Sequence, residues 1–190
     1  VQGGITREFL EDGPKTVPVE LTRPAEGYRF EGAHDGYVAA TGLTHARSLF
    51  LSLDGRSLEG EDYLAALDDA ARTRFDKAFD AGKLSGLAYD LHFHLHPDAE
   101  VAIDLGGQAV SLALRSGEIW VFRFDGKVSM GLEPSVYLEK GRLRPRATKQ
   151  IVLSGRAISY ATRARWSLAK AQDTATAVRD LAMDTLDVTL

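Results

Sequence analysis

Short apolar runs separated by turn signals constrain the fold of this sequence more than any other feature. Most runs recur every eight to twelve residues or so, with turn dipeptides such as Asp54-Gly55, Gly106-Gly107 and Ser116-Gly117 between them. Residues Val110 to Arg115 alternate between apolar and polar, which is typical of a strand with one buried face. The continuous apolar run Ile119 to Phe124 is typical of a strand buried on both faces. The rhythm predicts an all-β fold, an antiparallel β-sandwich.

The predicted strands cover residues 17–20, 27–31, 37–41, 45–53, 88–95, 100–104, 109–114, 118–124, 135–139, 150–154 and 164–169.

Two segments depart from this pattern and predict one or two short helical segments. Leu64, Leu67, Ala71, Phe75 and Phe79 recur at helical spacing, so residues 62–83 are interpreted as a helical insertion or connection. Weaker helical spacing recurs from Lys170 to about Met183. We therefore expect one sandwich domain over residues 1–169 and a C-terminal tail over residues 170–190, helical or disordered.

Three of the five histidines, His92, His94 and His96, alternate along one predicted strand. Side chains at i, i+2 and i+4 of a strand share a face, so the three imidazoles would lie opposite the apolar face formed by Leu91 and Phe93. A hydrogen-bonded or solvated sheet face is the simpler interpretation. The alternative is a stand-alone metal-dependent enzyme, which is disfavoured because no Asp or Glu is spaced to complete a coordination shell.

Charge and composition exclude several classes of protein. The formal net charge of −4 and a pI near 5.7 argue against nucleic-acid binding. Arg142, Arg144, Arg146 and Lys149 form a local basic cluster that would suit an acidic polysaccharide, although a solvated hairpin tip explains it more simply. Cysteine is absent, which excludes disulfides and thiolate chemistry and leaves the compartment open between periplasm and cytoplasm. No apolar stretch approaches the ~20 residues of a membrane span. We therefore expect a soluble piece of a longer protein with no membrane partner.

An ordered set of motifs resembles the C-terminal region of bacterial heparinase II/III family proteins. The matching pieces are Ala33-His34-Asp35-Gly36-Tyr37, Gly42-Leu43-Thr44-His45-Ala46-Arg47, Leu51-Ser52-Leu53-Asp54-Gly55-Arg56, Gly60-Glu61-Asp62, Phe93-His94-Leu95-His96-Pro97-Asp98, Ser116-Gly117-Glu118-Ile119-Trp120, Glu133-Pro134-Ser135-Val136-Tyr137 and Thr148-Lys149-Gln150-Ile151-Val152-Leu153. They follow the order found in the family and span most of residues 33–166. The resemblance implies polysaccharide lyases built from an N-terminal α/α toroid and a β-sandwich, of which this chain resembles the sandwich.

The family resemblance implies β-elimination at a uronic acid of an acidic glycan, with most catalytic groups on the toroid. It therefore implies a parent enzyme, no catalytic residue in this chain, and the toroid domain as partner. His34 resembles a zinc ligand position; the chain itself requires no cofactor, and a structural zinc is implied only for the full-length parent. An ordinary hydrogen-bonded turn residue is the equal alternative for His34.

Four further residues are candidates for substrate binding: His45, Arg47, His94 and His96. His45 and Arg47 would share a strand face, where a cross-strand polar pair is the simpler interpretation. A noncatalytic carbohydrate-binding or structural sandwich stays open as the alternative function. The glycan and the compartment are left open by the sequence.

Overall fold

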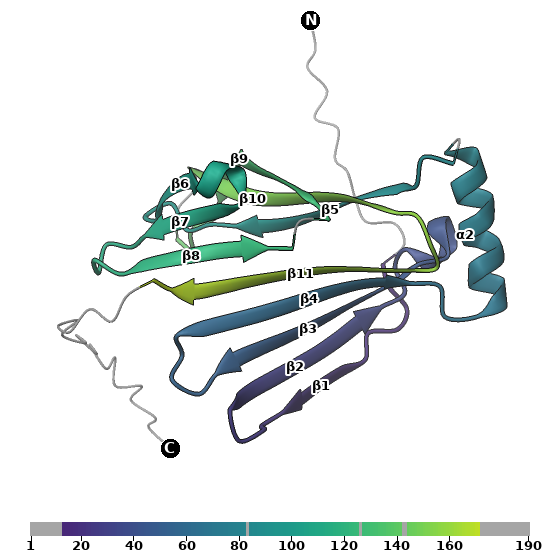
Figure 1. Ribbon diagram of the computed structural model, residues 1–190, viewed down its shortest axis with the longest axis horizontal. Coiled ribbons are helices and arrows are strands. Elements are labelled where there is room, and N and C mark those ends of the chain that lie inside the picture. Colours follow the sequence, from purple (N-terminus) through teal and green to yellow (C-terminus); the bar gives the residue numbers. More distant parts are fainter. Residues whose placement is uncertain (1–12, 83, 126, 142–143, 172–190) are drawn as a thin grey trace, which may run out of the picture.

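The structure is a computed structural model that describes residues 13–171 apart from residues 83, 126 and 142–143. The predicted C-terminal tail lies outside the described residues beyond position 171. Two antiparallel sheets face one another, with a helix across one end of the sandwich (Figure 1). The predicted antiparallel β-sandwich is therefore confirmed.

The larger sheet has the strand order β1-β2-β3-β4-β11-β8-β7-β6. Its strands are β1 (Val19–Thr22), β2 (Gly27–His34), β3 (Thr44–Ser52), β4 (Ser57–Ala65), β11 (Ala161–Lys170), β8 (Ile119–Phe124), β7 (Ala109–Ala113) and β6 (Glu100–Asp104). The smaller sheet has the order β5-β10-β9, with β5 (Leu87–His94), β10 (Arg146–Ala157) and β9 (Ser129–Tyr137). A short 3-10 turn, η1 (Leu105–Gly107), links β6 to β7.

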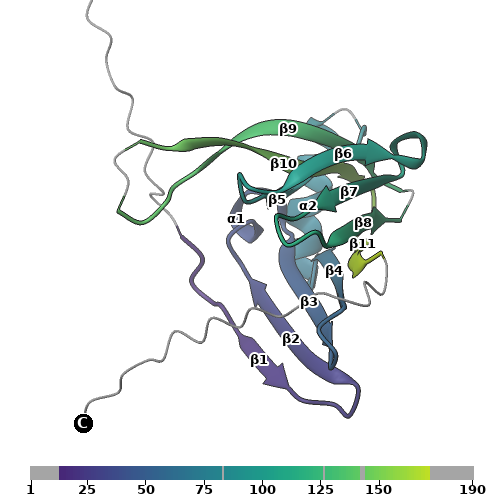
Figure 2. The same cartoon turned by 90° about the vertical axis from the view of Figure 1, so that its left-hand side faces the viewer.

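The core lies between the two sheets. Its buried members are Leu91, Val110, Leu112, Phe122, Val128, Ile151, Leu153, Ala164 and Trp166. They come from β5 and β10 of the smaller sheet and from β7, β8 and β11 of the larger one, with Val128 just before β9. Alternation along these strands places one face in the core and the other toward solvent. The sequence predicts this alternation for residues 110–115. The prediction that residues 119–124 are buried on both faces is wrong, because Ile119 and Arg123 on the outer face of β8 are exposed. Strands β1 to β3 lie beyond this region and splay away from the smaller sheet (Figure 2).

Helix α2 (Asp69–Ala81) covers one end of the sandwich (Figure 1). Its N-cap is Asp68, whose carboxylate accepts a hydrogen bond from the Ala71 backbone N–H at 2.7 Å. Phe75 is the main buried anchor of the helix, and it belongs to a second apolar cluster that includes Leu43, Leu64 and Ala157. Among the described residues, no helix is long and apolar enough to cross a membrane.

Two details of the sequence-based assignment are wrong. Residues 37–41 do not form a strand; they form a single helical turn, α1 (Val38–Thr41), closed at its C-cap by Gly42 with φ +74°. The helix predicted over residues 62–83 begins only at Asp69 in the structure. Residues 62–65 of the predicted helix are instead the end of strand β4. Gly60 and Asp62 interrupt the apolar alternation of β4, so only pairing with β3 and β11 makes this strand evident.

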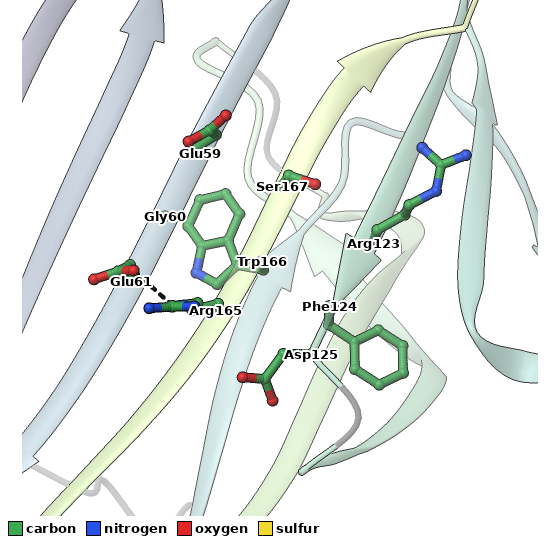
Figure 3. A pocket seen from close by; sticks show the side chains of 9 residues that line it. All are labelled: Glu59, Gly60, Glu61, Arg123, Phe124, Asp125, Arg165, Trp166 and Ser167. Atoms are coloured by element: carbon green, nitrogen blue, oxygen red, sulfur yellow. Dashed lines mark ion pairs between the residues drawn. The ribbon is translucent and has the colours of Figure 1, made fainter.

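Gly60 has no side chain, which lets the Trp166 indole pack against the backbone of β4. A Cβ atom at this position would lie 2.2 Å from Cε2 of the Trp166 indole, which packs directly over the glycine (Figure 3). We therefore expect Gly60→Ala to lower the free energy of unfolding by about 1–3 kcal/mol, the usual cost of overpacking.

Urea unfolding followed by tryptophan fluorescence would measure this loss. Gly55→Ala is not a suitable control, because Gly55 has φ +67° and the substitution would strain the backbone. Gly131→Ala is the matched control, since a Cβ there would have no heavy atom nearer than 3.8 Å. Equal stability of the Gly60 and Gly131 variants would contradict the steric argument.

Candidate functional site

Asp62 is the centre of the most unusual group of side chains in the described structure. The residue is only 3% exposed, and its carboxylate accepts three hydrogen bonds. The donors to Oδ1 are Arg47 Nε at 2.7 Å and His45 Nε2 at 2.8 Å. The donor to Oδ2 is Trp166 Nε1 at 2.9 Å. Buried carboxylates are rare unless paired, and this one is both paired and fully hydrogen-bonded.

Strand register brings these residues together. Asp62 on β4 lies opposite Arg47 on β3, while His34 on β2 lies opposite His45 on β3. Positions that face one another across antiparallel strands share one side of the sheet, here the side that faces the core. His34, His45 and Arg47 are candidates predicted from the sequence, and the structure places all three in this cluster.

Asp62 and Trp166 are functional candidates that the sequence analysis missed. Asp62 falls within the segment predicted as helix, and Trp166, on the strand predicted over residues 164–169, is not among the candidate binding residues. One sequence signal could have identified Asp62: it replaces an apolar residue in the alternation Leu58, Gly60, Asp62, Leu64. A carboxylate on the buried face of a strand needs partners, which predicts a polar cluster.

The hydrogen bonds fix the protonation pattern of the two histidines. The Gly36 backbone N–H can only donate, and it lies 3.3 Å from Nδ1 of His34, so that nitrogen accepts. Nε2 of His34 then carries the proton and donates to Nδ1 of His45 at 3.1 Å. Nε2 of His45 in turn donates to Asp62. This assignment, which follows from the network, gives an unbroken chain from Gly36 to Asp62 in which both imidazoles are neutral.

The electrostatics of the cluster agree with this pattern. Burial raises the pKa of Asp62, but the hydrogen bonds from His45, Arg47 and Trp166 outweigh it and hold that pKa below its ordinary value. Burial, helped by the neighbouring His45, lowers the pKa of His34, and Asp35 opposes this shift only weakly. The folded chain therefore favours an ionised Asp62 and a neutral His34.

A cavity of about 370 Å³ adjoins the cluster and lies between the larger sheet and β5. Its polar walls include His34, His45 and Arg47, and its floor includes the buried Leu43 and Leu64. Across the cavity stand residues 87–92 of β5. Burial raises the pKa of one of them, Tyr89, and the charges of Asp125 and Asp62 add to this shift. Cavities of this size with a few convergent polar groups are where small ligands bind.

The hydrogen bonds and ion pairs within the cluster limit which ligands this cavity can bind. The guanidinium of Arg47 is already paired with Asp62 and lies 5.8 Å from the Phe93 ring centroid, so a glycan carboxylate would have to compete for it. Both ring nitrogens of His34 are used in hydrogen bonds within the chain. The described residues include no group of three or more His, Cys, Asp or Glu side chains that could hold a metal ion. The described part of the chain therefore offers no complete ligand set for a zinc ion.

The other predicted binding residues lie elsewhere. His94 is on the outer face of the smaller sheet, where its Nδ1 lies 2.8 Å from the Ser135 hydroxyl. His92 stacks on His94 with ring centroids 6.4 Å apart. Nδ1 of His96 accepts a hydrogen bond from the Asp98 backbone N–H at 3.2 Å. His94 and His96 are therefore separated from His45 and Arg47 by the thickness of the smaller sheet, and the two pairs do not form one site.

The predicted basic cluster is partly neutralised. Arg146 donates to Asp98 at 2.6 Å and also lies 3.6 Å from Glu139. Arg142 lies outside the described residues. A second hollow, of about 340 Å³, lies on the larger sheet around Trp166 and is lined by charged side chains (Figure 3). Two of them, Glu61 and Arg165, form an ion pair at 2.8 Å, so this surface is largely self-compensated.

The lowered pKa of His34 predicts a loss of stability in mild acid. The unfolded chain takes up a proton at the ordinary value near 6.5, whereas the folded chain resists protonation until a lower pH. The contribution of neutral His34 is therefore complete above pH 6.5 and is lost as the pH falls through the lowered folded value. The urea concentration at the unfolding midpoint, measured at about pH 7.5, 6.5 and 5.5, should fall with decreasing pH in the wild-type protein. It should fall less steeply in the His34→Gln variant. Equal pH slopes for the two proteins would contradict the assignment.

The fold and the cluster together define a class: an all-β sandwich domain whose larger sheet carries an Asp-His-His-Arg network around a buried carboxylate. The family model described as heparinase II/III-like, C-terminal, matches residues 4–167. The chain therefore belongs to the heparinase II/III-like C-terminal family, as the motif order in the sequence predicts.

Individual relatives extend this comparison. FtsZ-localized protein C of Caulobacter vibrioides is 33% identical over 165 residues, which cover 86% of this chain and 27% of that protein. The crystal structure of the heparan sulfate lyase HepC from Pedobacter heparinus matches with a TM-score of 0.61 at 10% identity, over 81% of this chain and 21% of the lyase. A heparinase III structure matches with a TM-score of 0.59 at 12% identity, again over 81% and 21% of the two chains. At such identities the two structures show a shared fold, and this chain spans only about a quarter of the length of its relatives.

Proposed function

We propose that this chain is the C-terminal β-sandwich of a polysaccharide lyase that cleaves uronate-containing acidic glycans by β-elimination. The observation that carries the proposal is the family match over residues 4–167, together with the shared fold of a heparan sulfate lyase. The elimination needs a base for the proton α to the uronate carboxylate, an acid for the leaving oxygen and neutralisation of the carboxylate charge. We assign these tasks chiefly to an N-terminal α/α toroid and infer that the sandwich alone is inactive.

The cluster supports this division of labour. A general base needs a lone pair free to reach the substrate proton, but the lone pair of His34 accepts from Gly36 and that of His45 accepts from His34. Arg47 is likewise engaged by Asp62. The network therefore fits a role in shaping the sandwich better than a role in proton transfer. The structural zinc is kept as a proposal for the full-length protein alone, where ligands outside this sequence would have to displace the His34 hydrogen bonds.

The test compares this chain with the natural protein that includes any residues preceding Val1. Both are incubated with a panel of polyuronides, and the ultraviolet absorbance of the unsaturated uronate is followed. Absorbance with the longer protein alone supports the proposal and identifies the substrate. Absorbance with this chain alone contradicts the inference that it is inactive.

A noncatalytic structural or carbohydrate-binding module is the second candidate. One observation favours it: the relative that is 33% identical is named for its localization with FtsZ and not for an enzymatic activity. Absorbance from neither protein, with the longer protein folded and tested on the full panel, would favour this second function.

A further inference from the structure

The two sheets of the sandwich differ greatly in extent. The larger sheet has eight strands and the smaller sheet has three. Strand β5 is an edge of the smaller sheet, and it lies across the cavity from His34, His45 and Arg47 of the larger one. Beyond this edge the larger sheet continues through β3, β2 and β1 (Figure 2).

The core-facing side of the larger sheet stays apolar past this edge. One row of directly opposed residues runs across five strands: Trp166, Gly60, Leu49, Phe30 and Leu21. A parallel row consists of Leu168, Leu58, Leu51 and Tyr28. We call the outer part of these rows, formed by Leu51, Tyr28, Phe30 and Leu21, the apolar ledge.

Exposure rises along each row as it leaves the cover of the smaller sheet. Trp166 is 8% exposed, whereas Leu21, at the far end of the same row, is 72% exposed. Tyr28 and Leu51 are 39% and 40% exposed. The ledge is thus continuous with the core, which distinguishes it from the scattered apolar residues that are normal on a protein surface.

The edge of β5 offers backbone hydrogen bonds beside the ledge. The Leu95 N–H donates to the Lys149 carbonyl at 3.1 Å, and the register with β10 places Phe93 opposite Ile151 and Leu91 opposite Leu153. In an antiparallel pair every second residue bonds the partner strand, so the N–H and C=O groups of the intervening residues point away from β10. These residues are Ala88, Asp90, His92 and His94. Within the described part of the chain, β10 is the only strand that pairs with β5.

We propose that the open edge of β5 and the apolar ledge together accept one or more extra β-strands, supplied by the part of the longer natural protein that lies outside this sequence. Such strands would extend the smaller sheet over β3, β2 and β1, and their apolar side chains would face Leu51, Tyr28, Phe30 and Leu21. This is the strand-addition mode, in which the backbone supplies affinity and alternate side chains supply specificity. An added strand would also close the cavity over the end of the His34 network.

The lengths of the relatives support this occupant over a second copy of the chain. This chain spans 27% of the Caulobacter relative and 21% of the Pedobacter lyase, so in each of them most of the polypeptide lies outside the shared region. A strand from the same polypeptide has a high effective concentration at the edge, which a separate chain lacks.

Hydrogen exchange tests the proposal. Amide exchange is followed by mass spectrometry in this chain and in the natural protein that includes any residues preceding Val1 or following Leu190. We expect peptides covering β5 to exchange at least about tenfold more slowly in the longer protein, because the edge amides become hydrogen-bonded. Peptides covering β6, the far edge of the larger sheet, are the internal control and should exchange alike. Equal exchange of β5 in both proteins overturns the proposal, and β5 protection that grows with the concentration of this chain alone overturns it in favour of a second copy.

Substitutions on the ledge give an independent readout. Leu21→Asp should leave the Tm of this chain nearly unchanged, because Leu21 is already 72% exposed, whereas Tyr28→Asp should cost this chain slightly more, because Tyr28 is 39% exposed and contacts Arg23. The same substitutions should lower the Tm of the longer protein by several degrees, since a carboxylate would then be buried under the added strand. Ile119→Asp, at a position 46% exposed on the opposite side of the larger sheet, is the control and should be neutral in both. No difference between the two proteins overturns the proposal, and these readouts do not depend on lyase activity.

Discussion

Replacing Asp62 with alanine should lower the free energy of unfolding by about 3 kcal/mol, the lower end of the cost of breaking a buried ion pair. The substitution removes the acceptor for Arg47, His45 and Trp166 at once. The lower end applies because the Arg47 side chain is 32% exposed and can turn toward water, whereas the Trp166 indole N–H stays buried without a partner. Urea unfolding at neutral pH, followed by far-ultraviolet circular dichroism, measures the loss.

Glu59→Ala is the matched control for this change. Glu59 is an exposed carboxylate on the same strand and on the other side of the sheet, where substitutions usually change stability by less than about 0.5 kcal/mol. A loss for Asp62→Ala no greater than that for Glu59→Ala would show that the network contributes nothing to stability.

Replacing Trp166 with alanine should cost about 3–5 kcal/mol, the range for truncating a buried aromatic residue. The indole packs against Phe93 with ring centroids 4.8 Å apart and against Phe122 at 5.9 Å. It also covers Gly60 and donates to Asp62. The alanine variant loses the packing and the hydrogen bond together, and the same urea experiment reports the sum.

Trp166→Phe separates these two contributions. Phenylalanine keeps most of the ring packing but leaves Oδ2 of Asp62 without its donor, so we expect a smaller loss of about 1–3 kcal/mol. If the phenylalanine variant were as unstable as the alanine variant, the hydrogen bond and not the packing would dominate. If it were as stable as wild type, the donor to Asp62 would be energetically irrelevant.

The sequence by itself determined the fold class, the family and three members of the polar cluster. Strand alternation depends only on neighbouring residues, so segments such as 100–104 and 109–114 could be recognised without any tertiary information. The ordered motifs indicated the family that the match over residues 4–167 shows. His34 is a candidate because its motif resembles a zinc-ligand position of the family, and His45 and Arg47 are candidates because alternate residues of a strand share one face.

Only the tertiary structure decided what these residues do. Asp62 lies 17 positions from His45 and 104 positions from Trp166 in the chain, and strand pairing alone brings the three together. The short pattern of β4, interrupted by Gly60 and Asp62, is ambiguous until β3 and β11 pair with it, which is why its end was interpreted as helix. The open edge of β5 and the apolar ledge were likewise not predictable from the sequence. Whether a strand edge or an apolar row is covered depends on which strands become neighbours, and a local sequence pattern carries no information about that choice.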